Sequence, residues 1–294
     1  MSSPCLPKTI HAAFVLCCAL SPMVAVAQVS RHVEVRLDSA AGQSHASGRL
    51  LVFAMPADEA EAAAKEGKVE VVNASPMTPE AVTIAAMEVP FLAAGAGVVL
   101  DADAIAFPQP FARLPKGDYY LQAVLDGNRD YNYSGRGEGD LVSEPTRVRL
   151  GTAGWMPSLS LTRVLPARPD PWAVADDAPA EARAAMAATR AQTELLDFAS
   201  PALSKFWGRD IRMRGWVLLP PGYADAGNAK TRYPAVYFTH GFGGSLPGLV
   251  RSLAYVAEAM REGSMPPMIW VFLDESSATG THEFADSVNN GPWG

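Results

Sequence analysis

Short segments of alternating apolar and polar residues recur through the first half of the chain. Residues 32–37 and 118–125 alternate with a period of two, which is typical of strands that bury one face. Similar segments, separated by turns rich in proline and glycine, lie at 48–54, 83–89, 146–150 and 158–164. Strands at this spacing predict an all-β, sandwich-like domain over 28–166. Residues 57–68 are rich in alanine and glutamate and predict a short surface helix.

A different pattern follows this region. Residues 168–172 read Arg-Pro-Asp-Pro-Trp, and a residue before proline is disfavoured in a helix, so a linker is expected there. Residues 178–198 carry strong helix formers with no internal glycine or proline. Met186, Leu195 and Phe198 fall near one face at helical spacing. We therefore predict a linker and a connecting helix over 167–199.

A second domain is predicted over 200–294. Residues 204–208 and 211–219 predict two strands, and the apolar run at 234–239 predicts a strand buried on both faces. A second buried strand is expected at 268–273. Between these two, residues 246–262 predict a helix, with apolar positions at Leu249, Leu253, Val256 and Met260. A strand, a helix and a strand in this order imply a parallel sheet.

Residues 1–27 have the features of a secretory signal peptide. Lys8 gives a weakly positive start, 10–20 are apolar, and Ala-Val-Ala at 25–27 matches a small-X-small cleavage site. The apolar run is shorter than the ~20 residues that span a bilayer, so export is favoured over an uncleaved anchor or a lipoprotein. All three cysteines precede Gln28. An exported chain, periplasmic or extracellular, would therefore lack thiols for disulfides, nucleophiles or metal sites.

Composition narrows the function classes further. The hydrophobic share of 49% and the charged share of 19% are those of a folded globular protein. The formal net charge is −7, and lysine and arginine do not cluster with aromatic residues. Nucleic acid and stable membrane insertion are therefore not expected as partners.

The most informative motif follows the apolar run at 234–239 and reads His-Gly-Phe-Gly-Gly at 240–244. Glycines at 241, 243 and 244 would free the backbone for positive φ and let amide N–H groups converge on one point. Such donors stabilise the oxyanion that develops on the carbonyl oxygen during ester hydrolysis. A glycine-rich turn without a ligand, or a phosphate cradle, is the alternative. The lysine and hydroxyl of a P-loop do not follow Gly244.

Three segments together, at 216–223, 233–244 and 267–274, resemble the esterase D and enterochelin esterase-like branch of the α/β-hydrolases. That branch also contains feruloyl esterases and mycolyltransferases. The resemblance covers the last third of the chain and implies that 200–294 holds the first strands of an α/β-hydrolase domain. It further implies that Phe242 N–H, with Gly243 beside it, forms part of the oxyanion hole, and that no cofactor is needed.

No Gly-X-Ser-X-Gly motif, which carries the serine nucleophile of this fold, occurs in the chain. The nearest sequence, at 243–247, has Pro247 in place of the last glycine, so Ser245 is interpreted as a helix N-cap. The resemblance places nucleophile, acid and base beyond Gly294. Because the base follows the nucleophile in this fold, His240 is expected to shape the turn together with Gly241 and Gly244.

Other polar clusters give weaker signals. His282 and Glu283 lie in a loop that is either a polar surface or a wall of the substrate cleft. With Asp286 they lack metal-binding spacing, so no metal site is predicted. Asp274 is interpreted as a solvated strand end. Residues 126–137 imitate a calcium loop only over their first positions, and Tyr131, Tyr133 and Arg136 are weak candidates for carbohydrate contacts.

The preferred function is that of an exported serine carboxylic-ester hydrolase acting on a small-molecule or glycan-linked ester. An acyltransferase on the same fold and a non-catalytic periplasmic or surface protein that binds a glycan are the alternatives. A polypeptide ending at Gly294 would lack the triad and leave the apolar strand at 234–239 with an open edge. We would expect it to be inactive toward esters and poorly soluble.

Overall fold

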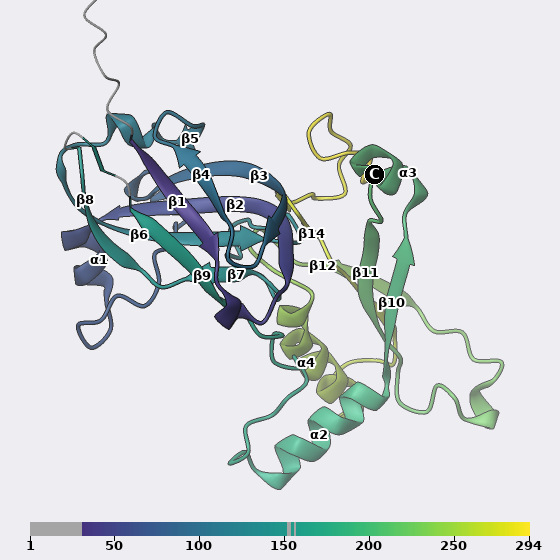
Figure 1. The fold of residues 1–294 in the computed structure, drawn as a ribbon. Coiled ribbons are helices and arrows are strands. Elements are labelled where there is room, and N and C mark those ends of the chain that lie inside the picture. Colours follow the sequence, from purple (N-terminus) through teal and green to yellow (C-terminus); the bar gives the residue numbers. More distant parts are fainter. Residues whose placement is uncertain (1–30, 152–153, 156) are drawn as a thin grey trace, which may run out of the picture.

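The computed structural model describes residues 31–151, 154–155 and 157–294. The protein is a mixed α/β structure with many strands and few helices (Figure 1). Two open sheets carry most of it: a nine-stranded sheet from the first half of the chain and a four-stranded sheet from the second half. We call them the N-terminal sheet and the C-terminal sheet. The predicted signal peptide at 1–27 lies outside the described residues.

The strands predicted for the first half of the chain are confirmed. The N-terminal sheet has the strand order β4-β1-β9-β7-β6-β2-β3-β5, and β8 pairs with β6. Its strands are β1 (His32–Leu37), β2 (His45–Pro56), β3 (Thr83–Ala93), β4 (Gly97–Asp101), β5 (Ala106–Phe107), β6 (Gly117–Asp126), β7 (Leu141–Ser143), β8 (Thr146–Leu150) and β9 (Ser158–Val164). The helix predicted at 57–68 is shorter and forms α1 (Ala57–Ala63).

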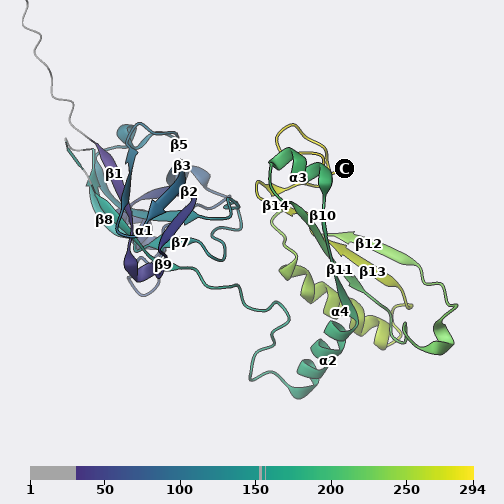
Figure 2. The ribbon, with the colours of Figure 1, turned by 45° about the vertical axis from the view of Figure 1, so that its right-hand side comes forward.

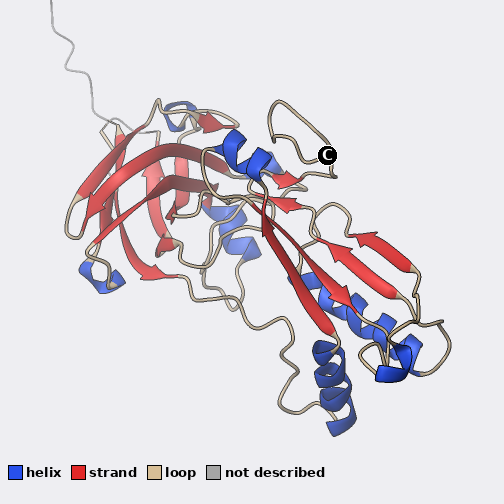
Figure 3. Ribbon diagram, turned by 90° about the vertical axis from the view of Figure 1, so that its right-hand side faces the viewer, coloured by secondary structure: helices blue, strands red, loops and turns tan. Residues whose placement is uncertain are grey.

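The N-terminal sheet is one hydrogen-bonded path and not the two separate sheets of a sandwich. The long strand β6 explains this, because it pairs with β2 along one edge and with both β8 and β7 along the other. The strands curve around a common core, visible in Figure 3. Fully buried members of that core include Val35, Leu50, Leu121 and Leu159. Alternate residues of β1, β2, β6 and β9 therefore point to one interior, as their period-two pattern predicts.

A second apolar cluster lies on the outer face of β2, β6 and β7. Phe53, Val124 and Val142 pack there against Val72 and Val82 from the segment between α1 and β3. The central strands of the N-terminal sheet are thus covered on both faces, which explains why β6 is buried over most of its length.

The connecting segment differs from the prediction. A linker leads from β9 to α2 (Ala180–Ala191), as Figure 2 shows, but the helix predicted to reach 198 ends at Ala191. Residues Thr193–Ala199 form strand β10 instead. They pair antiparallel with β11 (Arg212–Leu218) from Thr193 opposite Leu218 to Ala199 opposite Arg212. A full ladder of backbone hydrogen bonds to β11 outweighs the helix propensity of this stretch.

The strand predicted at 204–208 is a helix, α3 (Pro201–Trp207). The Ser200 hydroxyl accepts a hydrogen bond from Leu203 N, and Pro201 occupies the first turn, where its missing N–H costs nothing. Gly208 ends the helix in a left-handed conformation with φ of 65°. The start and stop signals of this helix are local to residues 200–208, whereas the strand prediction rests on the apolar residues between them.

The C-terminal sheet has the order β10-β11-β13-β12. Strands β12 (Ala235–Thr239) and β13 (Ile269–Leu273) are parallel and are joined through α4 (Val250–Arg261), so the predicted strand–helix–strand unit is confirmed. The predicted apolar positions of the helix are all buried. A small hairpin, β14 (Ser276–Ser277) and β15 (Gly280–Thr281), follows β13. Short 3₁₀ turns occur at Ser39–Ala41, Pro79–Ala81, Phe111–Arg113, Ala226–Asn228 and Pro247–Leu249.

The prediction that the strand at 234–239 is buried on both faces is wrong. Strand β12 is the outermost strand of the C-terminal sheet, and Tyr237 is 72% exposed. The apolar face of α4 packs on Leu218 of β11 and Phe272 of β13 rather than on β12. Within the part of the chain that the structure describes, no helix is long and apolar enough to cross a membrane.

Replacing Leu253 by alanine tests the role of α4. The Leu253 side chain is fully buried in the cluster that joins α4 to β11 and β13. Leu253→Ala should lower the free energy of unfolding by about 2–5 kcal/mol, because it removes buried surface and leaves a cavity. Tyr255→Ala, on the exposed side of the same helix, is the matched control. Urea unfolding that shows equal losses for both variants would contradict this packing.

Candidate functional site

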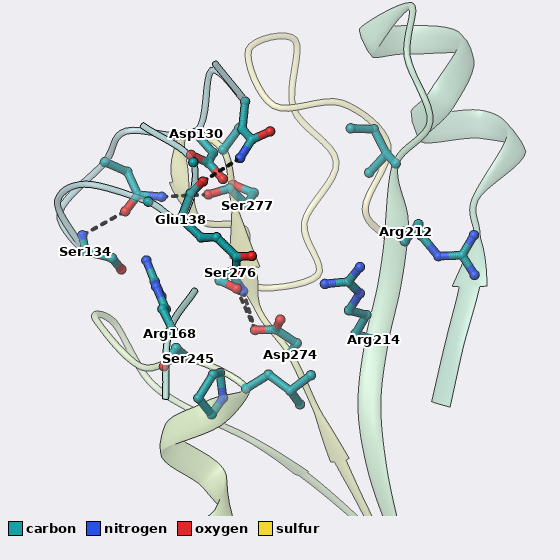
Figure 4. A pocket seen from close by; sticks show the side chains of 18 of the residues that line it. Asp130, Ser134, Glu138, Arg168, Arg212, Arg214, Ser245, Asp274, Ser276 and Ser277 are labelled. Atoms are coloured by element: carbon teal, nitrogen blue, oxygen red, sulfur yellow. Dashed lines mark hydrogen bonds between the residues drawn. The ribbon is translucent and has the colours of Figure 1, made fainter. Parts of the chain in front are cut away.

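A cleft of about 830 Å³ lies between the two sheets. The loop after β6, residues 127–139, forms one wall. The other wall consists of residues around the start of β11, the segment 245–247 and the segment 274–278 that follows β13. Figure 4 shows side chains from both walls converging on this space. The cleft therefore combines residues that are far apart in the sequence.

The lining of the cleft is polar and carries both charges. Its arginines are Arg168, Arg209, Arg212 and Arg214, and its acids are Asp130, Glu138, Asp210 and Asp274. The guanidinium of Arg212 turns away and pairs with Asp197, with Nε 2.7 Å from Oδ1. Arg214 Nε lies 3.6 Å from the same carboxylate oxygen of Asp197, and its guanidinium points into the cleft (Figure 4). Hydrogen-bond donors and acceptors are thus both available to a bound molecule.

The 240–244 turn lies at the carboxyl end of β12; its residues do not line the cleft, but Ser245, which follows the turn, does. Because β12 and β13 are parallel, His240 and Asp274, the residues that follow them, emerge side by side. His240 Nε2 lies 3.0 Å from Asp274 Oδ1 and 2.9 Å from the backbone nitrogen of Glu275. Its Nδ1 lies 3.1 Å from the carbonyl oxygen of Gly241. The buried imidazole therefore ties the turn to the end of the neighbouring strand, the turn-shaping position expected from sequence.

Asp274 is not the solvated strand end expected from sequence. Besides the imidazole, its Oδ1 accepts hydrogen bonds from the backbone nitrogen of Ser276 at 3.0 Å and from the Ser276 hydroxyl at 2.7 Å. The Ser276 hydroxyl therefore faces the carboxylate and not the imidazole. Ser276, Asp274 and His240 do not form a nucleophilic triad, in which the hydroxyl must face the imidazole.

The glycines of the turn have different tasks. Gly243 alone among the three has a left-handed backbone, with φ of 78°, so the expectation of positive φ at Gly241 and Gly244 is wrong. Gly244 is needed for space, since a Cβ there would lie 2.7 Å from the His240 ring. At Gly241 an added Cβ would meet nothing within 4 Å.

The backbone amide groups of Phe242 and Gly243 are available to bind a ligand. Among the described residues, neither N–H has a hydrogen-bond acceptor. Backbone donors left without partners at a strand end can receive an anion or an oxyanion. The Phe242 side chain is 73% exposed and rests against the ring of Tyr133 from the N-terminal sheet, with ring centroids 5.0 Å apart. Ser245, next to the turn, lines the cleft and makes no capping hydrogen bond to the following helix.

His282 and Glu283 do not line the cleft. The His282 ring is only 4% exposed and stacks on Trp293, with centroids 3.9 Å apart and planes 8° from parallel. Its Nδ1 accepts a hydrogen bond from the backbone nitrogen of Phe284, and burial lowers its pKa, which favours the neutral imidazole. Glu283 is exposed, with a positive φ of 53°. Asp274, Ser276 and Ser277, just before these two residues, line the cleft instead.

Hydrogen bonds inside the loop after β6 hold it in place. The Asp126 carboxylate accepts hydrogen bonds from the backbone nitrogens of Asp130 and Tyr131, which is the pattern of an Asp-containing turn and not of a calcium site. No cluster of acidic, histidine or cysteine side chains that could hold a metal occurs among the described residues. Burial, together with the charges of Asp126 and Asp130, raises the pKa of Asp140 to about 6.

The aromatic residues of this loop are engaged in internal contacts. The Tyr131 hydroxyl donates to Asn73 at 2.7 Å, and its ring packs edge-on against Phe53. Arg136 donates to Val72 and to Gln122 inside the N-terminal sheet. Neither lines the cleft, and Tyr133 contacts the C-terminal sheet, so this trio does not form an exposed carbohydrate platform.

Comparison with protein-family models gives no match, and comparison with curated proteins gives none either. The site must therefore be interpreted from its own geometry.

Substitution of two glycines tests the structure of the turn. Gly244→Ala places a methyl group against the His240 ring and should destabilise the protein by about 1–3 kcal/mol, as overpacking does. Gly241→Ala enters open space and should change stability by less than about 0.5 kcal/mol. Thermal unfolding monitored by circular dichroism measures both. A Gly241→Ala variant as unstable as Gly244→Ala would contradict this geometry.

The raised pKa of Asp140 predicts a pH dependence of stability. The folded state holds this proton more tightly than the unfolded state, so the contribution to stability is full at low pH and is lost as pH rises through about 6. Wild-type protein should gain about 1 kcal/mol relative to Asp140→Asn when the pH is lowered from near 7.5 to near 5. Urea unfolding at both pH values measures this difference. Parallel pH profiles for the two proteins would exclude the assignment.

Proposed function

We propose that the protein is an exported serine carboxylic-ester hydrolase of the α/β-hydrolase type, and that the 240–244 turn forms one side of its oxyanion hole. The observation that carries this proposal is the pair of amide groups at Phe242 and Gly243, which have no acceptor among the described residues. They stand at the carboxyl end of a parallel strand, the end at which open α/β sheets bind their ligands.

The chemistry follows from the charge that the reaction creates. A serine hydroxyl oxygen attacks the ester carbonyl carbon while a base takes its proton, and the carbonyl oxygen becomes an anion. The two amides would donate hydrogen bonds to that anion. Collapse of the tetrahedral intermediate releases the alcohol, which takes up the proton, and leaves an acyl-enzyme that water hydrolyses. No cofactor takes part in these steps.

The proposal requires a serine nucleophile and a base beyond the residues that form this turn. In the described part of the chain, no serine hydroxyl contacts His240 or His282. By its resemblance to the esterase branch, the chain would place the nucleophile after Gly294. An acyltransferase would use the same turn and replace water by another alcohol as acceptor.

A second candidate function is the binding of a glycan or another polar ligand without catalysis. The inter-sheet cleft favours it, because the lining mixes arginines, acids, serines and asparagines with the indoles of Trp207 and Trp293. Sugars need this combination of donors, acceptors and apolar surface. The same cleft would hold the alcohol or glycan part of an ester in the hydrolase.

Removal of one amide donor tests the hydrolase. In a protein that contains the serine nucleophile, Phe242→Pro deletes the N–H and should lower kcat for a p-nitrophenyl ester about 10²–10³-fold, as the loss of one oxyanion donor does. Phe242→Tyr keeps both the N–H and the aromatic ring and is the matched control, with kcat changed by less than about threefold.

Labelling with a fluorophosphonate measures the nucleophile independently of turnover. Wild-type protein that neither hydrolyses the ester nor accepts the label would refute the hydrolase. If calorimetry then showed binding of an oligosaccharide, the second candidate function would be supported.

A further inference from the structure

One tyrosine of the loop after β6 contacts both the 240–244 turn and the β14–β15 hairpin. Tyr133 lies in the loop after β6, and its hydroxyl is 2.8 Å from Oγ1 of Thr281 in β15. Its ring packs against Phe242, with centroids 5.0 Å apart and planes 44° from parallel. The same ring faces Gly280, where an added Cβ would lie 3.3 Å from it. One side chain from the N-terminal sheet therefore touches both loops that follow β12 and β13.

Neighbouring contacts hold the tyrosine in place. Asn132 Nδ2 donates to the carbonyl oxygen of Ser277 at 3.0 Å, and Asn132 Oδ1 accepts from the backbone nitrogen of Ser134 at 2.8 Å. On the other side of the cleft, Arg209 donates to the carbonyl oxygen of Asn128 at 2.7 Å. The loop after β6 is thus fastened to the C-terminal sheet at its beginning and at its middle.

The contact between Tyr133 and Phe242 matters because Phe242 belongs to the 240–244 turn. The Phe242 side chain is largely exposed, and the ring of Tyr133 is the aromatic contact that restrains it. Offset aromatic pairs and hydrogen bonds between side chains each favour one arrangement over others. Without Tyr133, the amides of Phe242 and Gly243 would depend for their direction on the His240 contacts and on the hydrogen bond from Gly244 N to Gly241 O, all of which lie within the C-terminal part of the chain.

We propose that Tyr133 is a positioning residue: it couples the N-terminal sheet to the 240–244 turn and to the β14–β15 hairpin, and so fixes the direction of the two free amides. This proposal depends on the proposed function in one respect only, namely that the two amides bind the oxyanion of an ester. Its consequence is that the ester site is shared between the two sheets and is not complete in the C-terminal sheet alone.

The ring and the hydroxyl have separable tasks. The ring contacts Phe242, while the hydroxyl bonds to Thr281. Tyr133→Phe should therefore loosen the hairpin and leave the turn in place, whereas Tyr133→Ala should loosen both. Thr281→Val removes the same hydrogen bond from the opposite side and should reproduce the effect of Tyr133→Phe, even if Tyr133→Ala folds poorly.

Hydrogen exchange on the full chain tests the coupling without reference to catalysis. In Tyr133→Ala, the hydrogen-bonded amide of Gly244 in the turn and the bonded amides of 276–281 should exchange about tenfold faster than in wild type, while those of β2 and β6 should not change. Tyr131→Phe, which removes a hydroxyl bonded to Asn73, is the matched control and should change neither segment. Unchanged exchange at Gly244 in Tyr133→Ala would overturn the proposal.

An activity measurement separates this inference from the proposed function. If the complete gene product hydrolyses esters, Tyr133→Ala should lower kcat about tenfold with a smaller change in KM, because the misdirected amides act on the transition state. Equal activity of Tyr133→Ala and wild type would overturn the positioning role. If wild type has no activity and exchange still rises in Tyr133→Ala, the coupling stands and the hydrolase fails.

Discussion

The parallel pairing of β12 and β13 is the constraint on which the site depends. Thr239 lies opposite Leu273 in this register, so both strands end at the same level and the next residues, His240 and Asp274, come within hydrogen-bond distance. A shift of one residue would turn the side chains to opposite faces and separate the imidazole from the carboxylate. The turn, the free amides and the floor of the cleft all follow from this register.

A second constraint comes from the loop after β6. Buried carboxylates at Asp126 and Asp140 hold it through backbone N–H groups at its beginning and end. Hydrogen bonds from backbone N–H groups stabilise the charged form of a carboxylate, whereas burial and repulsion between neighbouring carboxylates destabilise it. At Asp140 the destabilising effects are larger, because the pKa of its carboxyl is raised. The loop is therefore rigid enough to present Asn132 and Tyr133 to the C-terminal sheet, at the cost of some stability at neutral pH.

The failures of the sequence-based predictions have two causes: distant backbone partners and local helix caps. Residues Thr193–Ala199 have helix-forming composition, yet they form β10 because β11 offers a complete set of backbone partners. Pro201–Trp207 contain the apolar and aromatic residues of a strand, yet local capping makes them a helix. For Ala235–Thr239, apolar composition predicts burial, but depth in a sheet depends on how many strands lie beyond it, and among the described residues there are none. The residue pattern within one segment does not show which distant strands pair with that segment.

The sequence by itself determined six strands of the N-terminal sheet (β1, β2, β3, β6, β8 and β9), the parallel strand–helix–strand unit and the glycine-rich turn after β12, because hydrophobic period and glycine act over a few residues. It also drew attention to His240 and Phe242. Only the tertiary structure decided that Asp274 faces His240, that His282 is buried against Trp293, and that Tyr133 reaches Phe242 from another sheet. These contacts join residues separated by 11 to 109 positions, and no local pattern encodes which of them meet.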